Sequence, residues 1–317
     1  MQLRPLGSTG LQVAPIVFGG NVFGWTADEA RSFELLDAFV DAGFNAIDTA
    51  DVYSRWVPGH QGGESETIIG RWLKARPSRR DKVLLFTKGG GDMGEGHKGL
   101  SARWIEQAAE DSLRRLQTDV IDLYQSHFPD PGTPHEETLG AFDRLVKAGK
   151  VRAIGCSNFD AAQLRAALDT SHSHGLPAYG TLQPEYNLVE RGKYEGPLRD
   201  LALREGLGVI PYFSLASGFL TGKYRSAADL EGKARARGAG KYLDARGLRV
   251  LETLDAVARR RGATPAEVAL AWLIAREGVT APIASATTVE QVQSFVRASI
   301  LRLDAEDRRR LVEASSP

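Results

Sequence analysis

The sequence predicts an α/β fold, a (β/α)8 TIM barrel preceded by an N-terminal β-hairpin. Short apolar runs alternate with longer helical patterns along the chain, and eight such strand-then-helix units can be followed. This alternation is typical of parallel strands joined by right-handed crossovers. The length of 317 residues suits one barrel, and no linker or low-complexity tract interrupts the pattern. We therefore expect residues 1–317 to form one domain.

The first half of the chain opens on the hairpin. Residues 2–6 and 11–14 flank the turn Ser8-Thr9-Gly10, and we expect this hairpin to cover the bottom of the barrel. Ser101 is a typical N-cap, since its hydroxyl can accept a hydrogen bond from a free backbone N–H group. The predicted strands are 16–18, 45–47, 83–87 and 120–125, followed by helices 28–42, 64–75, 101–116 and 135–148.

The second half continues the alternation until residue 300. Thr264 followed by Pro265 is an N-cap with proline at the first helical position. Residues 214–246 are too long and irregular for a simple connection, so we predict that they form a lid. The strands are 151–155, 178–182, 208–212 and 280–283, and the helices are 160–168, 194–205, 247–261, 265–275 and 289–300.

Composition excludes several classes of partner. Lys+Arg and Asp+Glu both number 40, so the formal net charge of zero predicts neither nucleic acid nor an anionic membrane as a partner. No apolar run approaches the roughly 20 residues of a membrane span. The one cysteine, Cys156, cannot form an intramolecular disulfide, which favours a reducing compartment. We expect a cytoplasmic protein without a metal site; the oligomeric state stays open.

Four chemically matched side chains follow adjacent predicted strands. Asp48 and Tyr53 follow strand 45–47, Lys88 ends the next strand, and His127 follows the one after that. In a barrel the loops after the strands open onto one face, where binding and reaction sites are built. Each residue alone has an ordinary structural interpretation, such as a cap, a rim residue or a core histidine. The hypothesis of a site depends on the four together.

These four groups can form a proton donor. Tyrosine has an ordinary pKa of about 10, and a neighbouring ammonium lowers it. Lys88 can supply that charge, and Asp48 can keep Lys88 protonated and in place. His127 can orient a substrate carbonyl by hydrogen bonding. No serine or cysteine nucleophile accompanies a base, so the arrangement favours protonation of an oxygen while a nicotinamide delivers hydride to carbon.

The same segments resemble the aldo-keto reductase superfamily along nearly the whole chain. The resemblance covers RPLGSTGLQVAPIVFGG, GFNAIDTADVY with Asp48 and Tyr53, LFTKGGG with Lys88, and GLSARWIEQAAEDSLRRLQTDVIDLYQSHFPDP around His127. It continues in LVKAGKVRAIGCSNF, LQPEYNLVER, IPYFSLASGFLTGKY and PIASATTVEQV. Matches this numerous, in this order, are more specific than any single motif.

The resemblance implies an NAD(P)H-dependent carbonyl reductase with Asp48, Tyr53, Lys88 and His127 as its catalytic tetrad. Ser157, Asn158 and Gln183 would hold the nicotinamide carboxamide, and Tyr212 would stack on the ring. The pyrophosphate would lie against Ser214, Leu215, Ser217, Gly218 and Lys223. The adenosine end would lie near Ser285, Ala286, Thr287 and Gln291.

Some positions depart from the family pattern. Phe128 follows the predicted catalytic histidine where tryptophan is frequent. Ser285-Ala286-Thr287 carries no lysine or arginine for a 2′-phosphate, and Phe295 stands where asparagine is frequent. We still expect a modest preference for NADPH, with NADH also used, because Arg225, Lys233, Arg235 and Arg237 of the predicted lid are candidates to reach the 2′-phosphate. Candidate substrate-pocket residues are Trp25, Trp56 and Phe128, which suit a small-molecule carbonyl substrate.

Two other functions remain open. The first is a nucleotide-binding regulatory subunit with low turnover, as in channel-associated relatives; the intact tetrad argues against it. The second is a barrel isomerase or aldolase in which Lys88 forms a Schiff base. That chemistry needs a neutral lysine, and Asp48 beside it argues against this alternative.

Overall fold

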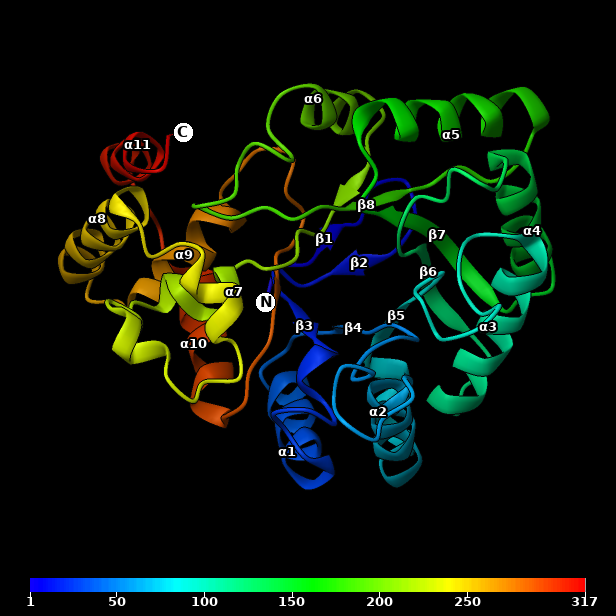
Figure 1. Cartoon of the computed structure of the whole chain (residues 1–317), viewed down its shortest axis with the longest axis horizontal. Helices are drawn as coiled ribbons and strands as arrows, with labels where there is room; N and C mark the ends of the chain where they lie inside the picture. The colour runs from blue at the N-terminus through cyan, green and yellow to red at the C-terminus, as the bar shows by residue number, and fades with distance from the viewer. Residues whose placement is uncertain (317) are drawn as a thin grey trace.

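Eight parallel β-strands form the centre of the structure. The computed structural model describes residues 1–316. Hydrogen-bonded neighbours follow the order β10-β3-β4-β5-β6-β7-β8-β9, and helices surround these strands on all sides (Figure 1). The strands are β3 (Val17–Gly19), β4 (Ala46–Asp48), β5 (Leu84–Gly89), β6 (Ile121–Ser126), β7 (Val151–Ser157), β8 (Thr181–Gln183), β9 (Gly208–Val209) and β10 (Ile283–Ala284).

The sheet closes between β9 and β10. β10 pairs in parallel with β3. On its other side, the N–H of Thr280 donates to the carbonyl of Val209 at 2.8 Å, and the N–H of Ile283 donates to the carbonyl of Pro211 at 2.9 Å. These bonds join the two edges of the sheet, so the predicted closed barrel is confirmed.

The helices begin where the sequence offers caps. Ser101 accepts from the N–H of Trp104 at 3.4 Å, and Thr264 accepts from Glu267 at 3.3 Å in a capping box with Pro265 in the first turn. The helices are α1 (Glu29–Asp41), α2 (Glu64–Ala75), α3 (Ala102–Leu116), α4 (His135–Lys147), α5 (Ala161–His174), α6 (Pro197–Arg204), α7 (Ala236–Gly240), α8 (Ala245–Arg261), α9 (Pro265–Ile274), α10 (Val289–Ile300) and α11 (Ala305–Ala314). Within residues 1–316, no helix combines the length and apolar character that a membrane crossing requires.

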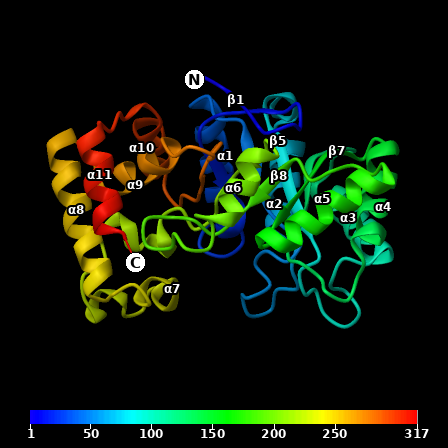
Figure 2. The ribbon, with the colours of Figure 1, turned by 90° about the horizontal axis from the view of Figure 1, so that it is seen from above.

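The structure differs from the sequence prediction at several boundaries. α5 continues to His174, beyond the predicted end at residue 168, and α6 begins at Pro197 instead of residue 194. The irregular stretch 214–246 contains two 3-10 helices, η3 (Ala216–Thr221) and η4 (Ala227–Leu230), in addition to α7. α11, not predicted as a separate unit, packs beside α8 in both views (Figures 1 and 2).

Two apolar layers hold the barrel together. The inner layer takes one residue from most strands and is completed by Leu6 and Val13 of the hairpin β1 (Arg4–Pro5) and β2 (Gln12–Val13). The hairpin lies on the face opposite α7 (Figure 2) and covers the bottom of the barrel, as predicted. The larger outer layer lies between strands and helices. Residues that line the inner layer are Val17, Ala46, Phe86, Leu123, Ala153, Ile210 and Ile283.

Candidate active site

Polar side chains replace the apolar ones further along the same strand faces. Side chains alternate between the two faces of a strand, so the residue two positions after an inner-layer residue also points into the barrel. Ala46 is thus followed by Asp48, Phe86 by Lys88, and Leu123 by Gln125. Gln183 of β8 and Tyr212, which follows β9, belong to the same ring. All but Tyr212 are buried.

Lys88 is the centre of this polar ring. Its Nζ donates to Asp48 Oδ2 at 2.8 Å, to the carbonyl of Thr49 at 2.7 Å, and to the Tyr53 hydroxyl at 3.1 Å. Burial is the largest single influence and disfavours the ammonium, but the charges and hydrogen bonds of Asp48 and Tyr53 together outweigh it, so the pKa of Lys88 lies above its ordinary value. All three N–H donors are used, and the lysine is fully buried. A neutral, nucleophilic Lys88 does not fit these contacts, which argues against Schiff-base chemistry.

Tyr53 is a weaker acid than the sequence suggested. The expectation was that Lys88 lowers its pKa below 10. The Lys88 ammonium does act in that direction, but burial of the phenol acts more strongly in the other, and the pKa of Tyr53 is raised. The cause is the low-dielectric surroundings, which disfavour the phenolate. Tyr53 therefore stays protonated across the neutral pH range.

His127 lies against the same phenol. The centres of the His127 and Tyr53 rings are 6.0 Å apart. Burial, assisted by the charge of Lys88, holds the pKa of His127 well below its ordinary value, so the imidazole is neutral. Its Nδ1 atom is buried and has no hydrogen-bond partner among residues 1–316. A neutral imidazole beside a protonated phenol can bind the oxygen of a carbonyl compound.

The three residues expected at the nicotinamide carboxamide belong to one hydrogen-bond network, in which the Asn158 amide donates to Ser157 Oγ at 3.1 Å. The amide of Asn158 donates to the His127 carbonyl at 2.9 Å and accepts from the Tyr212 hydroxyl at 2.7 Å. Ser157 donates to the Gln183 carbonyl at 2.8 Å, and Gln183 donates to Asp48 Oδ1 at 2.9 Å. Most donors are used, but lone pairs remain on the oxygens of each side chain. The remaining capacity suits an N–H donor such as a carboxamide NH2 group.

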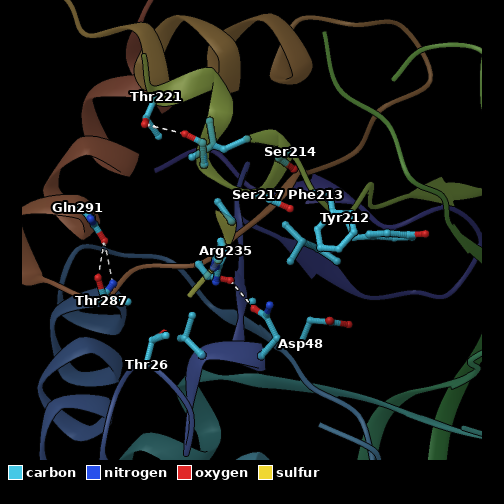
Figure 3. Close-up of a pocket in the computed structure, with 18 of the residues that line it drawn as sticks. Thr26, Asp48, Tyr212, Phe213, Ser214, Ser217, Thr221, Arg235, Thr287 and Gln291 are labelled. Carbon is cyan, nitrogen blue, oxygen red and sulfur yellow. Dashed lines mark hydrogen bonds between the residues drawn. The ribbon is translucent and has the colours of Figure 1, made fainter. Parts of the chain in front are cut away.

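These side chains open into a pocket of about 620 Å³. In the close-up, Thr287 and Gln291 lie at one end, Tyr212 and Asp48 at the other, and Arg235 between them (Figure 3). Lys88, Ala286 and Trp25 do not line the pocket: Lys88 is buried behind Tyr53, and Trp25 packs edge-on against Trp56 with ring centres 5.7 Å apart. The predicted residues that line it are Asp48, Tyr53, His127, Ser157, Asn158, Gln183, Tyr212, Ser214, Leu215, Ser217, Gly218, Lys223, Ser285, Thr287, Gln291, Trp56 and Phe128.

The segment after β9 has an unusual backbone. Phe213, Ala216 and Ser217 have φ angles of 52°, 50° and 57°, a region that side chains other than glycine rarely adopt. Such strain persists only where surrounding structure enforces it, and it is frequent at ligand-binding sites. Gly218 follows with a φ of 90°. The turn brings small residues to the pocket wall, where backbone can approach a phosphate closely.

Sequence reasoning missed several lining residues. Asn21 accepts from Ser285 Oγ at 2.6 Å across the pocket floor, and Phe213 adds an exposed ring beside Tyr212. Asn21 and Phe213 both come shortly after a predicted strand, and this position could have indicated that they line the pocket. Other lining residues, such as Thr26 in the loop before α1 and Ala266 and Leu270 on α9, lie outside the segments that carry the family resemblance. Only the folded chain brings them to the pocket.

The basic residues of segment 214–246 differ in whether they reach the pocket. Lys233 and Arg235 line the pocket, and the Arg235 guanidinium lies 5.4 Å from the centre of the Trp25 ring. Arg225 instead pairs with Asp255 at 2.8 Å, and Arg237 is exposed outside the lining. Arg235 has no carboxylate within ion-pair distance in the part of the chain that the structure describes. Among residues 1–316, no cluster of histidine, cysteine, aspartate or glutamate could hold a metal ion.

Comparison with known proteins shows the family of the chain. A model of the aldo/keto reductase family matches residues 15–316. The chain is 37% identical to an uncharacterized oxidoreductase, YrpG, of Bacillus subtilis (strain 168), over 96% of this chain and 93% of the relative. It is 33% identical to the aldo-keto reductase AMT2 of Alternaria alternata (97% and 90% covered). It is also 33% identical to a probable voltage-gated potassium channel subunit beta of Arabidopsis thaliana (94% and 91% covered). The chain therefore belongs to the aldo/keto reductase family.

Proposed function

We propose that this protein is an NAD(P)H-dependent reductase that converts aldehydes or ketones to alcohols. The observation that carries the proposal is the contact between the Tyr53 hydroxyl and the Lys88 ammonium, 3.1 Å apart at the floor of the pocket, beside a neutral His127. A proton donor, a charge to stabilise it once deprotonated, and a second group for the carbonyl oxygen thus meet at one point.

Each member of the tetrad has its own task in this proposal. Tyr53 gives its proton to the substrate oxygen. Lys88 stabilises the resulting phenolate, and Asp48 keeps Lys88 charged through the 2.8 Å contact. His127 holds the carbonyl oxygen. A bound nicotinamide supplies the hydride that reduces the carbonyl carbon.

In this proposal a dinucleotide would lie along the length of the pocket. The free acceptors of Ser157, Asn158 and Gln183 suit the carboxamide, beside the ring of Tyr212. The strained turn at 213–218 and Lys223 suit the pyrophosphate. Thr287 and Gln291 suit the adenosine end, where the N–H of Thr287 donates to Gln291 at 2.7 Å.

We infer a modest preference for NADPH. Lys233 and Arg235 are the basic residues of segment 214–246, beyond Lys223, that reach the pocket. A charge-assisted contact to a 2′-phosphate contributes roughly 1.5–3 kcal/mol, or about tenfold or more in affinity. Residues 285–287 include no lysine or arginine that could add a second contact to this phosphate, so NADH should bind as well. Comparable affinities for both cofactors at low and moderate salt would contradict this preference.

The substrate end of the pocket favours an apolar carbonyl compound. Trp56, Phe128 and Phe213 are large side chains that line it and are nearly half exposed at its rim. Phe128 stacks on His127 with ring centres 4.4 Å apart, and Trp56 contacts Tyr53 edge-on at 5.9 Å. An aromatic or other apolar aldehyde would cover these rings. The buried, unpaired Cys156 supports a reducing compartment, and we propose the cytoplasm.

The experiment is a comparison of turnover and binding. Wild type should oxidise NADPH in the presence of aromatic aldehydes. Tyr53→Phe should lose turnover by at least about 100-fold but still bind NADPH, because the phenol acts on substrate. Tyr194→Phe is a matched control, since that hydroxyl donates to Gly278 outside the pocket and its loss should leave turnover intact.

A binding protein without turnover is the alternative, favoured by the likeness to a protein named as a potassium channel subunit. NADPH binding by wild type without reduction of any aldehyde in a broad panel would support it. Wild-type turnover in Tyr53→Phe would instead overturn the assignment of the proton donor.

A further inference from the structure

A second buried acid lies next to the tetrad and is not used by it. Asp51 is 1% exposed and belongs to the turn that connects Asp48 with Tyr53. Its backbone N–H donates to the carbonyl of Lys88 at 3.1 Å. Neither of its carboxylate oxygens has a hydrogen-bond partner among residues 1–316. A buried carboxylate without donors is costly in its charged form.

The positive groups around Asp51 are committed to other acceptors. The three donors of Lys88 go to Asp48, Thr49 and Tyr53. On α3, the Arg115 guanidinium binds Glu66 of α2, with Nε 2.7 Å from Oε2. Asp51 therefore faces cations that are already neutralised.

The remaining neighbours also disfavour a charge on Asp51. Glu66 is a fully buried carboxylate that accepts from Thr87 at 2.5 Å, and its charge opposes ionisation of Asp51. The backbone N–H of Val52 acts to lower the pKa of Asp51, but it does not meet the geometry of a hydrogen bond to the carboxylate. Tyr124 of β6 is a neutral phenol on the same side. Burial first, and Glu66 second, raise the pKa of Asp51 to about 8.

We propose that Asp51 is a positioning residue for Tyr53: it stays a neutral carboxylic acid at neutral pH, and its ionisation in alkaline solution weakens Tyr53 as a proton donor. With Asp51 neutral, the tetrad holds one negative charge, Asp48, and one positive charge, Lys88. An ionised Asp51 adds a negative charge to the buried turn that carries Tyr53, and this charge acts to raise the pKa of Tyr53. The coupling to turnover rests on the proposed function of Tyr53, whereas the protonation state does not.

The protonation state is tested without any activity. Wild type labelled with [13C]carboxyl-aspartate should show one aspartate resonance that titrates near pH 8 and that disappears in Asp51→Asn. Folding gives a second measurement. Unfolded Asp51 loses its proton near pH 4 and folded Asp51 near 8, so raising the pH destabilises wild type but not Asp51→Asn. The ratio of their unfolding constants should change about tenfold per pH unit between pH 5 and 8.

The coupling is tested by single-turnover reduction with saturating NADPH and aldehyde. Below pH 7 the rates of wild type and Asp51→Asn should agree within about twofold. Above pH 8.5 wild type should be slower by roughly threefold, because a donor with a higher pKa transfers its proton less readily. Asp92→Asn is the control: its exposed carboxylate pairs with Arg55, and the pH profile should match wild type.

These experiments test the protonation state of Asp51 and its coupling to Tyr53 separately. If no aspartate resonance titrates between pH 7 and 9, Asp51 is not a neutral acid and the inference is overturned, even should Asp51→Asn fail to fold. If the resonance is found but the rate profiles coincide, the coupling to Tyr53 is overturned. Turnover in Tyr53→Phe would refute the proposed function while leaving the titration of Asp51 unchanged.

Discussion

Replacing Lys88 with methionine removes a buried charge while keeping most of the side-chain volume. The Nζ atom that is lost donates to Asp48, Thr49 and Tyr53. Asp48, which is 1% exposed, would keep only the amides of Gln183 at 2.9 Å and Gln125 at 3.5 Å. Leaving one partner of a buried ion pair alone costs about 3–5 kcal/mol of folding free energy.

The assays follow from these contacts. Thermal unfolding of Lys88→Met should occur on the order of 6–12 °C below wild type. Aldehyde reduction should fall by about 10²–10⁴, because the Tyr53 phenolate loses its stabilising charge. NADPH binding should survive, since Lys88 does not line the pocket.

A double replacement separates stability from turnover. Asp48→Asn in the Lys88→Met background removes the isolated carboxylate, so the double variant should regain about 3 kcal/mol of stability. Its turnover should stay as low as that of Lys88→Met. The reasoning is refuted if Lys88→Met unfolds and turns over like wild type, or if the second replacement restores no stability.

Three further predictions concern the cofactor, the pH and the substrate. Arg235→Met should weaken NADPH binding by about tenfold with little effect on NADH, whereas Arg225→Met should change neither; fluorescence titration measures both. Between pH 7 and 5, His127→Gln should lose less folding stability than wild type, because histidine binds a proton there in the unfolded chain whereas buried His127 does not. Denaturant titrations at each pH measure this, and equal losses of stability in both proteins would contradict it. Phe128→Ala should raise KM for aromatic aldehydes several-fold more than for short aliphatic ones, and an equal change for both would exclude stacking on Phe128.

The sequence by itself determined the barrel and the positions of the main polar groups. Strand and helix patterns are local, and alternation along a strand decides which side chains face inward. Asp48 and Lys88 lie two residues after inner apolar residues, so their meeting follows from the topology once the strands are parallel. The caps at Ser101 and Thr264 were also predictable, since capping depends on neighbouring residues.

Tertiary structure decided what depends on burial and on distances between remote segments. The sequence indicated that Lys88 lowers the pKa of Tyr53, but the direction reverses because packing removes water from the phenol. The basic residues of segment 214–246 look alike in the sequence. Only the fold shows that Lys233 and Arg235 reach the pocket, whereas Arg225 binds Asp255. Asp51 looked like part of a family motif, and its isolation appears only when Lys88 and Arg115 are seen bound elsewhere. Electrostatic free energies depend on all surrounding charges and solvent, which a linear pattern does not contain.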